Sequence, residues 1–167
     1  MGAMFDFRTA QDLPKPELYR ELLSAADALT AGETDSVANM ANVAALLWEF
    51  LPDVNWTGFY RATGTGEEAE LVLGPFAGRP ACIRIAMGKG VCGTAATTGE
   101  TQLVPDVHAF PGHIACDGAT QSELVVPVKR DGNVIAVIDC DSPSPARFDT
   151  QDAEGIEALA TLLAERI

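Results

Sequence analysis

The sequence contains no long uninterrupted apolar stretch. No segment approaches the roughly 18 consecutive apolar residues that a membrane-spanning helix needs, although 47% of the residues are hydrophobic and can supply a folded core. The N-terminal stretch MGAMFDFRTAQDLPKPE has neither a basic region nor an apolar core followed by a cleavage site. We therefore expect no membrane span and no secretory signal, and we expect a cytoplasmic location.

Basic residues are scarce. Eleven Lys and Arg oppose 24 Asp and Glu, which gives a formal net charge of -13. Such a surface repels phosphate backbones and anionic lipids, so nucleic acid and membranes are poor partners. The acidity is typical of a solvated, soluble surface. The length of 167 residues fits one domain, and we predict a single domain over residues 1–167 without a linker or repeat.

Paired cysteine motifs are absent. The four cysteines are Cys82, Cys92, Cys116 and Cys140, and no two of them form a Cys-x-x-Cys pair. This absence excludes a zinc ribbon and a thioredoxin-type motif. In a reducing compartment thiols stay free unless they are catalytic or bind metal. Each cysteine taken alone can also be an inert, buried small residue.

Hydrophobic spacing and turn residues predict the order of the elements. Amphipathic helices are expected over about 15–30, from 34 or 35 to Pro52, and from about 150 onward. Between the first two helices and the last lie several short runs with strand character. These runs begin at Asn55, Glu70, Ala81 and Thr101, with a glycine-hinged turn and a short helix before the last of them.

The C-terminal half of the chain contains a long loop and a hairpin. The segment VPDVHAFPGHIACDGAT has no periodicity and is rich in Pro, Gly and Asp. Long loops in compact domains are often functional. The runs SELVVPVKR and NVIAVIDCD predict a hairpin around Asp131-Gly132. Successive hairpin-type strands with flanking helices indicate an antiparallel sheet with helices packed to one side, an α+β domain.

The register of this hairpin decides which side chains share a face. A two-residue turn would place Glu123 opposite Cys140. A three-residue loop over 130–132 instead pairs Leu124 with Ile138 and keeps one face wholly apolar, with Cys140 on it. We therefore predict the three-residue loop and a Glu123–Asp139 pair. The face away from the apolar core then gathers three carboxylates: Glu123, Asp139 and Asp141.

A long part of the sequence resembles a known enzyme family. The segment LVLGPFAGRPACIRIAMGKGVCGTAATTGETQLVPDVHAFPGHIACDGATQSELVVPV closely resembles the free methionine-(R)-sulfoxide reductase family, and NWTGFY and IDCDSP fit it too. The match is dense from about Asn55 to Pro143. The resemblance implies the GAF fold, with about six antiparallel strands, helices on one face and a ligand pocket on the other. It also implies reduction of free methionine-(R)-sulfoxide by cysteine thiols, regeneration by thioredoxin, and a homodimer.

The resemblance extends to individual cysteines. Cys116, in GHIACD, is similar to the catalytic nucleophile, and Cys82, in ACIRI, to the main resolving cysteine. Cys92, in GVCGTA, is similar to the third, auxiliary cysteine. Cys140 departs from the family, which has an aliphatic residue between the two aspartates. We expect Cys116 on its loop to be accessible, Cys82 to be fixed on a strand, and their Cα atoms to lie within about 7 Å.

The carboxylates and an aromatic residue complete the predicted site. Glu123, Asp139 and Asp141 match the family's substrate-binding and acid–base carboxylates, with Glu123 and Asp141 expected to be catalytic. Clustered carboxylates repel each other, so at least one should keep its proton and be able to protonate the sulfoxide oxygen. Ionised ones suit the substrate's ammonium group. Trp56 is a candidate contact for the S-methyl group, although it and Tyr60 can equally be core residues, and the three acids can be solvated strand ends.

Other functions stay open at this point. A GAF sensor would bind a small ligand without chemistry, and a redox switch would use a disulfide to control a partner. His108 and His113 could also bind zinc with Cys116 and Cys82 or Cys92, but their spacing is irregular. GKGVCG is neither a P-loop nor a dinucleotide fingerprint. We therefore expect no cofactor and no metal, and thiol-dependent consumption of methionine sulfoxide would separate the enzyme from the alternatives.

Overall fold

The computed structural model describes residues 12–114 and 116–167; residues 1–11, which hold most of the N-terminal stretch considered above, lie outside the described residues. In chain order the described residues form α1 (Lys15–Thr30), α2 (Ser36–Phe50), β1 (Trp56–Thr63), the 3-10 turn η1 (Gly66–Glu68), β2 (Glu70–Gly78), β3 (Arg84–Ala86), α3 (Gly90–Thr98), β4 (Gln102–Val104), the 3-10 turn η2 (Val107–Ala109), β5 (Ser122–Arg130), β6 (Asn133–Ser142) and α4 (Thr150–Leu163). None of the helices among these residues is both long and apolar enough to cross a bilayer.

One antiparallel sheet organises the described part of the chain. Its strand order is β3-β2-β1-β6-β5-β4, which confirms the predicted α+β class. β3 is shorter than expected, because it pairs only with Glu70–Val72 at the start of β2. The strand therefore begins at Arg84, and Cys82 lies in the preceding loop. The prediction that Cys82 sits on a strand was wrong.

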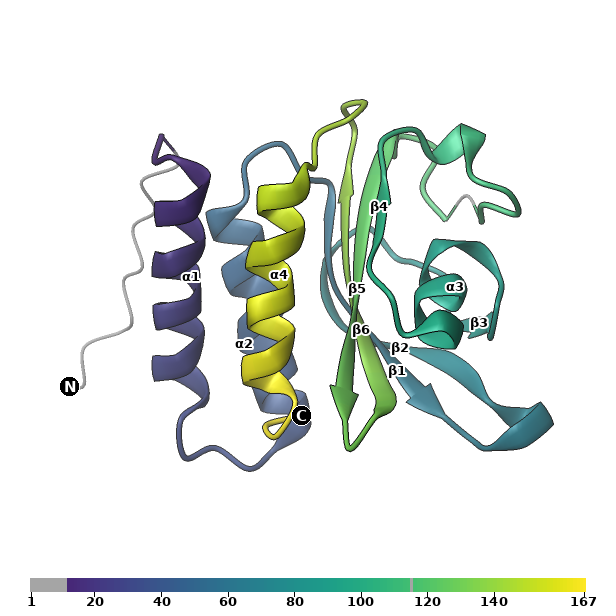
Figure 1. Ribbon diagram of the computed structural model, residues 1–167, viewed down its shortest axis with the longest axis horizontal. Coiled ribbons are helices and arrows are strands. Elements are labelled where there is room, and N and C mark those ends of the chain that lie inside the picture. Colours follow the sequence, from purple (N-terminus) through teal and green to yellow (C-terminus); the bar gives the residue numbers. More distant parts are fainter. Residues whose placement is uncertain (1–11, 115) are drawn as a thin grey trace.

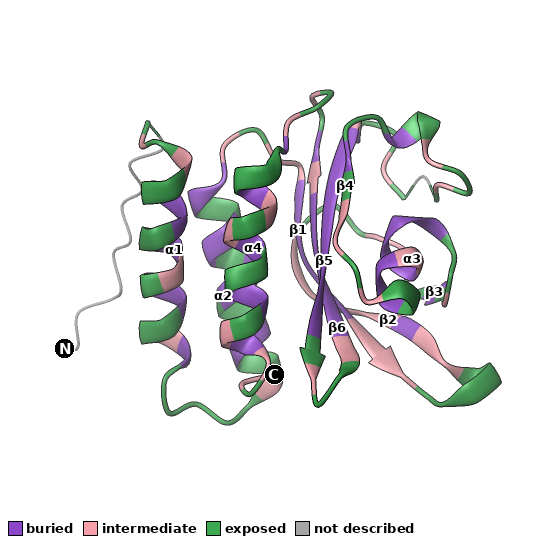
Figure 2. Ribbon diagram, viewed as in Figure 1, coloured by how far each residue is buried: buried purple, intermediate pink, exposed green. Residues whose placement is uncertain are grey.

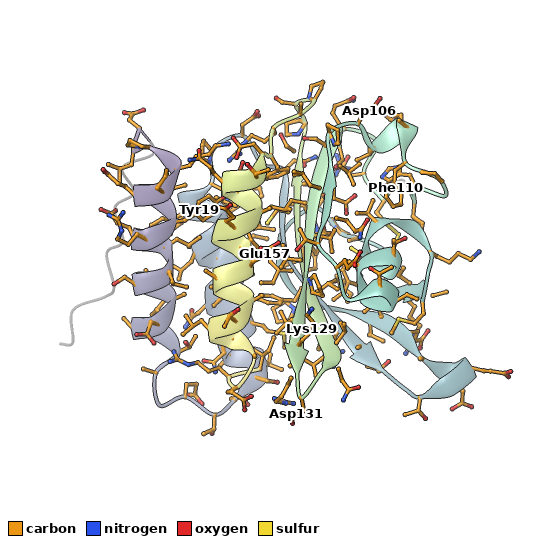
Figure 3. All side chains as sticks on the ribbon, in the orientation of Figure 1. Tyr19, Asp106, Phe110, Lys129, Asp131 and Glu157 are labelled. Atoms are coloured by element: carbon orange, nitrogen blue, oxygen red, sulfur yellow. A yellow bond between two sulfur atoms is a disulfide. The ribbon has the colours of Figure 1, made fainter. Side chains whose placement is uncertain are left out.

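Three helices cover one face of the sheet. Helices α2 and α4 lie against the strands, and α1 packs on their outer side (Figure 1). In Figure 2 the outward face of α1 is exposed, whereas β5 is buried along most of its length. Tyr19 on α1, labelled in Figure 3, donates a hydrogen bond of 2.6 Å to the buried Asp152 of α4. Fully buried side chains from the helices and the sheet form this core, among them Leu22, Leu47, Ile138 and Ile156.

The short helix α3 lies on the opposite face of the sheet. Its residues Cys92 and Ala95 pack in a second apolar cluster with Val125 and Val137. The expectation that the helices lie on one face of the sheet thus holds for α1, α2 and α4, whereas α3 lies on the other face. Close packing of α3 depends on Gly93, because a Cβ atom there would lie 2.6 Å from the carbonyl oxygen of Ala86.

The β5–β6 hairpin combines a tight turn with a bulge. Asp131 and Gly132 both have positive φ, 52° and 80°, as a two-residue type I′ turn requires. Asp131 marks the tip of the hairpin in Figure 3. A register shift follows, because Val128 pairs with Ala136 while the next residue of β5 pairs with Val134. The residue at 135 is therefore unpaired, and this bulge reconciles the two-residue turn with an apolar face.

The predicted three-residue loop and the Glu123–Asp139 pair were therefore wrong. Glu123 faces Asp141, and Leu124 faces Cys140. This register differs from the predicted one by two residues, and a shift of two leaves every side chain on its expected face. Cys140 is accordingly fully buried in the core beneath the three helices. The three acids lie on the other face.

Candidate active site

A small cavity lies on the sheet face that carries α3. Its interior leaves about 40 Å³ open to water. Strands β1, β5 and β6 supply its floor, α3 one wall, and the long loop after β4 its cover. The lining includes Trp56, Tyr60, Cys92, His113, Ile114, Cys116, Asp117, Thr120, Glu123, Asp139 and Asp141. Every predicted site residue except Cys82 thus lines one cavity.

Three carboxylates meet at the floor of the cavity. Glu123 comes from β5, and Asp139 and Asp141 come from β6. Glu123 and Asp139 are only 7% and 5% exposed. One oxygen of Asp139 and one of Asp141, Oδ1 in each case, are buried without a hydrogen-bond partner among the described residues. Because buried polar atoms are normally paired, these oxygens point to a ligand with donors.

Burial and mutual repulsion set the protonation of this cluster. Burial, followed by repulsion from Asp139, raises the pKa of Glu123 and of Asp141 well above the ordinary range. Burial also raises the pKa of Asp139, but hydrogen bonds from Glu123, Cys92 and Asp141 oppose this rise. These directions favour a protonated Glu123 and Asp141, with Asp139 as the carboxylate most readily ionised. The cluster can therefore offer both a proton and a negative charge.

A disulfide joins the loop over the cavity to the segment before β3. Cys82 and Cys116 are bonded, with Cα atoms 5.8 Å apart, which confirms the predicted proximity. Cys116 is exposed on its loop and Cys82 is half-buried. Tyr60 on β1 donates a hydrogen bond of 2.9 Å to the carbonyl oxygen of Cys82. Cys82 is thus held by a strand side chain and not by strand pairing.

Cys92 occupies a different environment from the disulfide pair. It lies buried in the first turn of α3, with Sγ 3.4 Å from Oδ2 of Asp139 and 3.9 Å from Oε1 of Glu123. Burial and the neighbouring carboxylates raise the pKa of the Cys92 thiol well above its usual value. Since the thiolate is the reactive form, Cys92 is a hydrogen-bond donor to the carboxylates and a poor nucleophile.

An aromatic wall closes one side of the cavity. The rings of Trp56 and Tyr60 stack with centroids 5.8 Å apart, and Phe76 stacks on Trp56 at 5.1 Å. Trp56 also donates a hydrogen bond of 3.2 Å to the carbonyl oxygen of Arg79. Trp56 and Tyr60 are both buried and both line the cavity. Trp56 and Tyr60 are therefore core residues that also form a wall of the cavity.

The sequence interpretation missed Asp117 and Thr120, which line the cavity, and Asn55, which contacts both of them. Asn55, just before β1, donates hydrogen bonds to Oγ1 of Thr120 at 3.2 Å and to Oδ2 of Asp117 at 3.5 Å. Its backbone N–H donates to the carbonyl oxygen of Asp141 at 2.9 Å. Asn55 thereby ties the loop of Cys116 to the strand of the carboxylates. The only available signal was that Asp117 and Thr120 follow Cys116 in the same loop.

The zinc alternative based on the two histidines does not match the geometry. The ring centroids of His108 and His113 are 6.4 Å apart, and the rings meet edge to face. Cys116, the proposed third ligand, is bonded to Cys82. Burial and the neighbouring His108 lower the pKa of His113. The two histidine rings therefore contact each other, and the sulfur of Cys116 is engaged in the disulfide.

Comparison with known proteins places this fold and site in a family. The GAF domain family matches residues 27–167. Free methionine-R-sulfoxide reductases from Saccharomyces cerevisiae and Escherichia coli are each 47% identical; the matches cover 92% and 89% of this chain and 88% of each relative. The X-ray structure of free methionine-R-sulfoxide reductase from Neisseria meningitidis in complex with its substrate superimposes with a TM-score of 0.88 at 45% identity, covering 99% of this chain and 95% of that one.

The fold is thus that of a GAF domain whose cavity combines cysteines with buried acids. The chain belongs to the GAF-domain family of free methionine-R-sulfoxide reductases. This membership confirms the resemblance drawn from the sequence.

Proposed function

We propose that this protein reduces free methionine-(R)-sulfoxide to methionine, with Cys116 as the nucleophile. The observation that carries the proposal is the position of the cysteines. Cys116 lies at the exposed mouth of the cavity, bonded to Cys82, while the carboxyl groups of Glu123, Asp139 and Asp141 form the floor of the same cavity. Sulfoxide reduction needs a nucleophile on sulfur and a proton on oxygen, and these two requirements meet in one cavity.

The reaction follows from the two groups. The thiolate of Cys116 attacks the sulfoxide sulfur, and Glu123 or Asp141 gives its proton to the sulfoxide oxygen. This attack forms a sulfur–sulfur bond to Cys116. As that bond breaks, the hydroxyl group passes from the methionine sulfur to the Cys116 sulfur, so methionine leaves with a lone pair on its sulfur and Cys116 becomes a sulfenic acid. The thiol of Cys82 then condenses with it, water is released and the Cys82–Cys116 disulfide forms.

The floor of the cavity supports the preference for a free amino acid. The unpartnered oxygens of Asp139 and Asp141 can accept hydrogen bonds from an α-ammonium group. A methionine sulfoxide within a peptide has a neutral amide in place of this ammonium, so it cannot provide the charge. The Trp56–Tyr60 wall offers a favourable surface for the S-methyl group.

Thioredoxin is proposed as the reductant, by thiol–disulfide exchange at Cys116. Two exposed apolar side chains neighbour the disulfide in sequence: Ile83 is 68% exposed and Ile114 is 38% exposed. Because a reductant must approach the disulfide, these two exposed side chains are placed where it would contact the protein. The cytoplasmic location stays an expectation from the sequence. A homodimer is proposed on the family resemblance alone, and light scattering in solution measures the oligomeric state.

The decisive assay follows NADPH consumption with thioredoxin and its reductase. Four substrates are compared: the two sulfoxide epimers, each as the free amino acid and within a peptide. We expect turnover with the free R epimer only, and none above background with Cys116→Ser. Equal rates on peptide substrates would contradict the ammonium argument. Absence of turnover on all four would favour a sensor or a redox switch instead.

A further inference from the structure

The thiol of Cys92 points into the carboxylate cluster, an arrangement that reduction by Cys116 and Cys82 does not require. Cys92 Sγ and one oxygen each of Glu123 and Asp139 all lie within 4.8 Å of one another. We propose that these three side chains bind a thiophilic divalent cation, with Zn²⁺ as the best fit. The ion would compete with substrate and is not a cofactor.

The spacing of the three atoms fits a tetrahedral ion. Zinc–sulfur and zinc–oxygen bonds of about 2.3 Å and 2.1 Å place two ligand atoms of a tetrahedron about 3.6 Å apart. The observed separations from Cys92 Sγ are 3.4 Å to Asp139 and 3.9 Å to Glu123. Small side-chain movements therefore suffice to close the site around an ion, with a fourth position left for Asp141 or water.

The ionised Asp139 within this cluster also suits a cation. Three carboxylates lie together, and none of the ion pairs found among residues 12–114 and 116–167 involves them. Asp139 is only 5% exposed, and its Oδ1 has no hydrogen-bond partner among the described residues. The basic residues lining the cavity, Arg79 and Lys89, are exposed at its rim. A cation bound at Oδ2 of Asp139, the oxygen that faces Cys92, compensates the charge of this carboxylate, and the unpartnered Oδ1 can join it if the carboxylate binds through both oxygens.

The donor set selects the kind of ion. Mg²⁺ and Ca²⁺ prefer oxygen ligands alone, whereas a thiolate with carboxylates suits Zn²⁺ and Co²⁺. Binding releases two protons to solvent, one from the Cys92 thiol and one from the Glu123 carboxyl group. The ion occupies the space that the substrate's ammonium group takes in the proposed function. Competition between ion and substrate therefore rests on that function, whereas binding of the ion does not.

The test uses the disulfide form of the protein, because Cys82 and Cys116 then cannot act as ligands. Co²⁺ is added and thiolate-to-cobalt charge-transfer absorption is recorded, followed by displacement with Zn²⁺. We expect the wild type and Cys140→Ala, whose removed thiol lies on the other sheet face, to show the same absorption. Cys92→Ala should show none. Glu123→Gln keeps the thiol and should weaken Zn²⁺ binding by at least about tenfold, the scale that even outer-shell partners of a metal contribute.

Two results would reject the metal site. Absence of the absorption in the folded wild type would overturn the proposal, as would its persistence in Cys92→Ala. Should Cys92→Ala fail to fold, Glu123→Gln decides: unchanged Zn²⁺ affinity there rejects the site. Turnover measured separately in the presence of a chelator tests the proposed function independently, since failure of the enzyme assay leaves the cobalt spectrum unaffected.

Discussion

At the scale of single residues, the acids of the cavity floor work against the stability of the fold. Burial raises the pKa of Glu123 and Asp141 well above their ordinary values. A group with a raised folded pKa contributes stability that is fully present below its unfolded pKa and is lost as pH rises toward the folded pKa. Glu123 and Asp141 should therefore contribute more to the free energy of unfolding at pH 4 than at pH 8.

Glu123→Gln separates catalysis from stability. Removing the proton donor should lower turnover by about 10²-fold, the usual scale for acid–base catalysis. The variant should nevertheless melt at a higher temperature than the wild type at pH 8, because a buried ionisable group that repels its neighbours is gone. At pH 4 the two melting temperatures should converge. Thermal unfolding at both pH values, with the exposed Glu154→Gln as control, checks this; a variant less stable at both would contradict the account.

Cys140 gives a complementary prediction. Its side chain is fully buried among the apolar residues beneath the helices, on the sheet face away from the cavity. Cys140→Ala should keep most of the turnover and form the Cys82–Cys116 disulfide normally. Loss of the sulfur atom should lower the free energy of unfolding by about 1 kcal/mol. A folded Cys140→Ala protein without activity would show that the cysteine takes part in the redox cycle.

At the scale of elements, two glycines hold helices close to their neighbours on opposite sides of the sheet. A Cβ atom at Gly93 would meet the backbone of Ala86 at 2.6 Å, and one at Gly155 would meet the ring of Tyr19 at 2.2 Å. Alanine at either position should lower the free energy of unfolding by about 1–3 kcal/mol, as overpacking does. Only Gly93→Ala moves the helix that carries Cys92. We therefore expect it alone to raise KM, and equal KM values for the two folded variants would contradict this.

Several elements could be predicted from local sequence and others could not. The ends of α1 and α2 follow from Pro14, Gly32 and the N-cap Asp35, which accepts a hydrogen bond from Ala38. Alternation along β5 and β6 correctly separated the acidic face from the apolar face. It could not distinguish registers two residues apart, because both satisfy the same alternation. The bulge opposite Val128 and Lys129, which sets the true register, has no local signature.

The site was predictable to a similar extent. The cysteines and acids have chemistry that stands out in the sequence, and the resemblance gave each one a role. Asn55 was missed because its function depends on contacts with Thr120 and Asp117, more than sixty residues away. The same holds for Cys82, which is held by Tyr60 and not by a strand. Such long-range contacts arise only from the folded chain.

At the scale of the whole molecule, the sheet separates two tasks. The core on its helical side is apolar and contains no predicted site residue. The opposite face carries α3, the carboxylates and the disulfide-bearing loop. This division explains how three acids, two of them buried, can lie together: the large core on the first face offsets the free-energy cost of placing them there. The loop that carries Cys116 covers this second face, and reduction of the disulfide releases it from Cys82.

The central claim, that Cys116 is the nucleophile and Cys82 its resolver, is tested most directly by counting methionine formed without reductant. Fully reduced wild-type protein mixed with excess free methionine-(R)-sulfoxide should yield about one methionine per chain and then stop with the disulfide closed. Cys116→Ser should yield none. Cys82→Ser should complete one turnover and then hold a sulfenic acid or a substitute disulfide through Cys92. If Cys116→Ser still forms a stoichiometric amount of methionine, another cysteine attacks the substrate and the account is wrong.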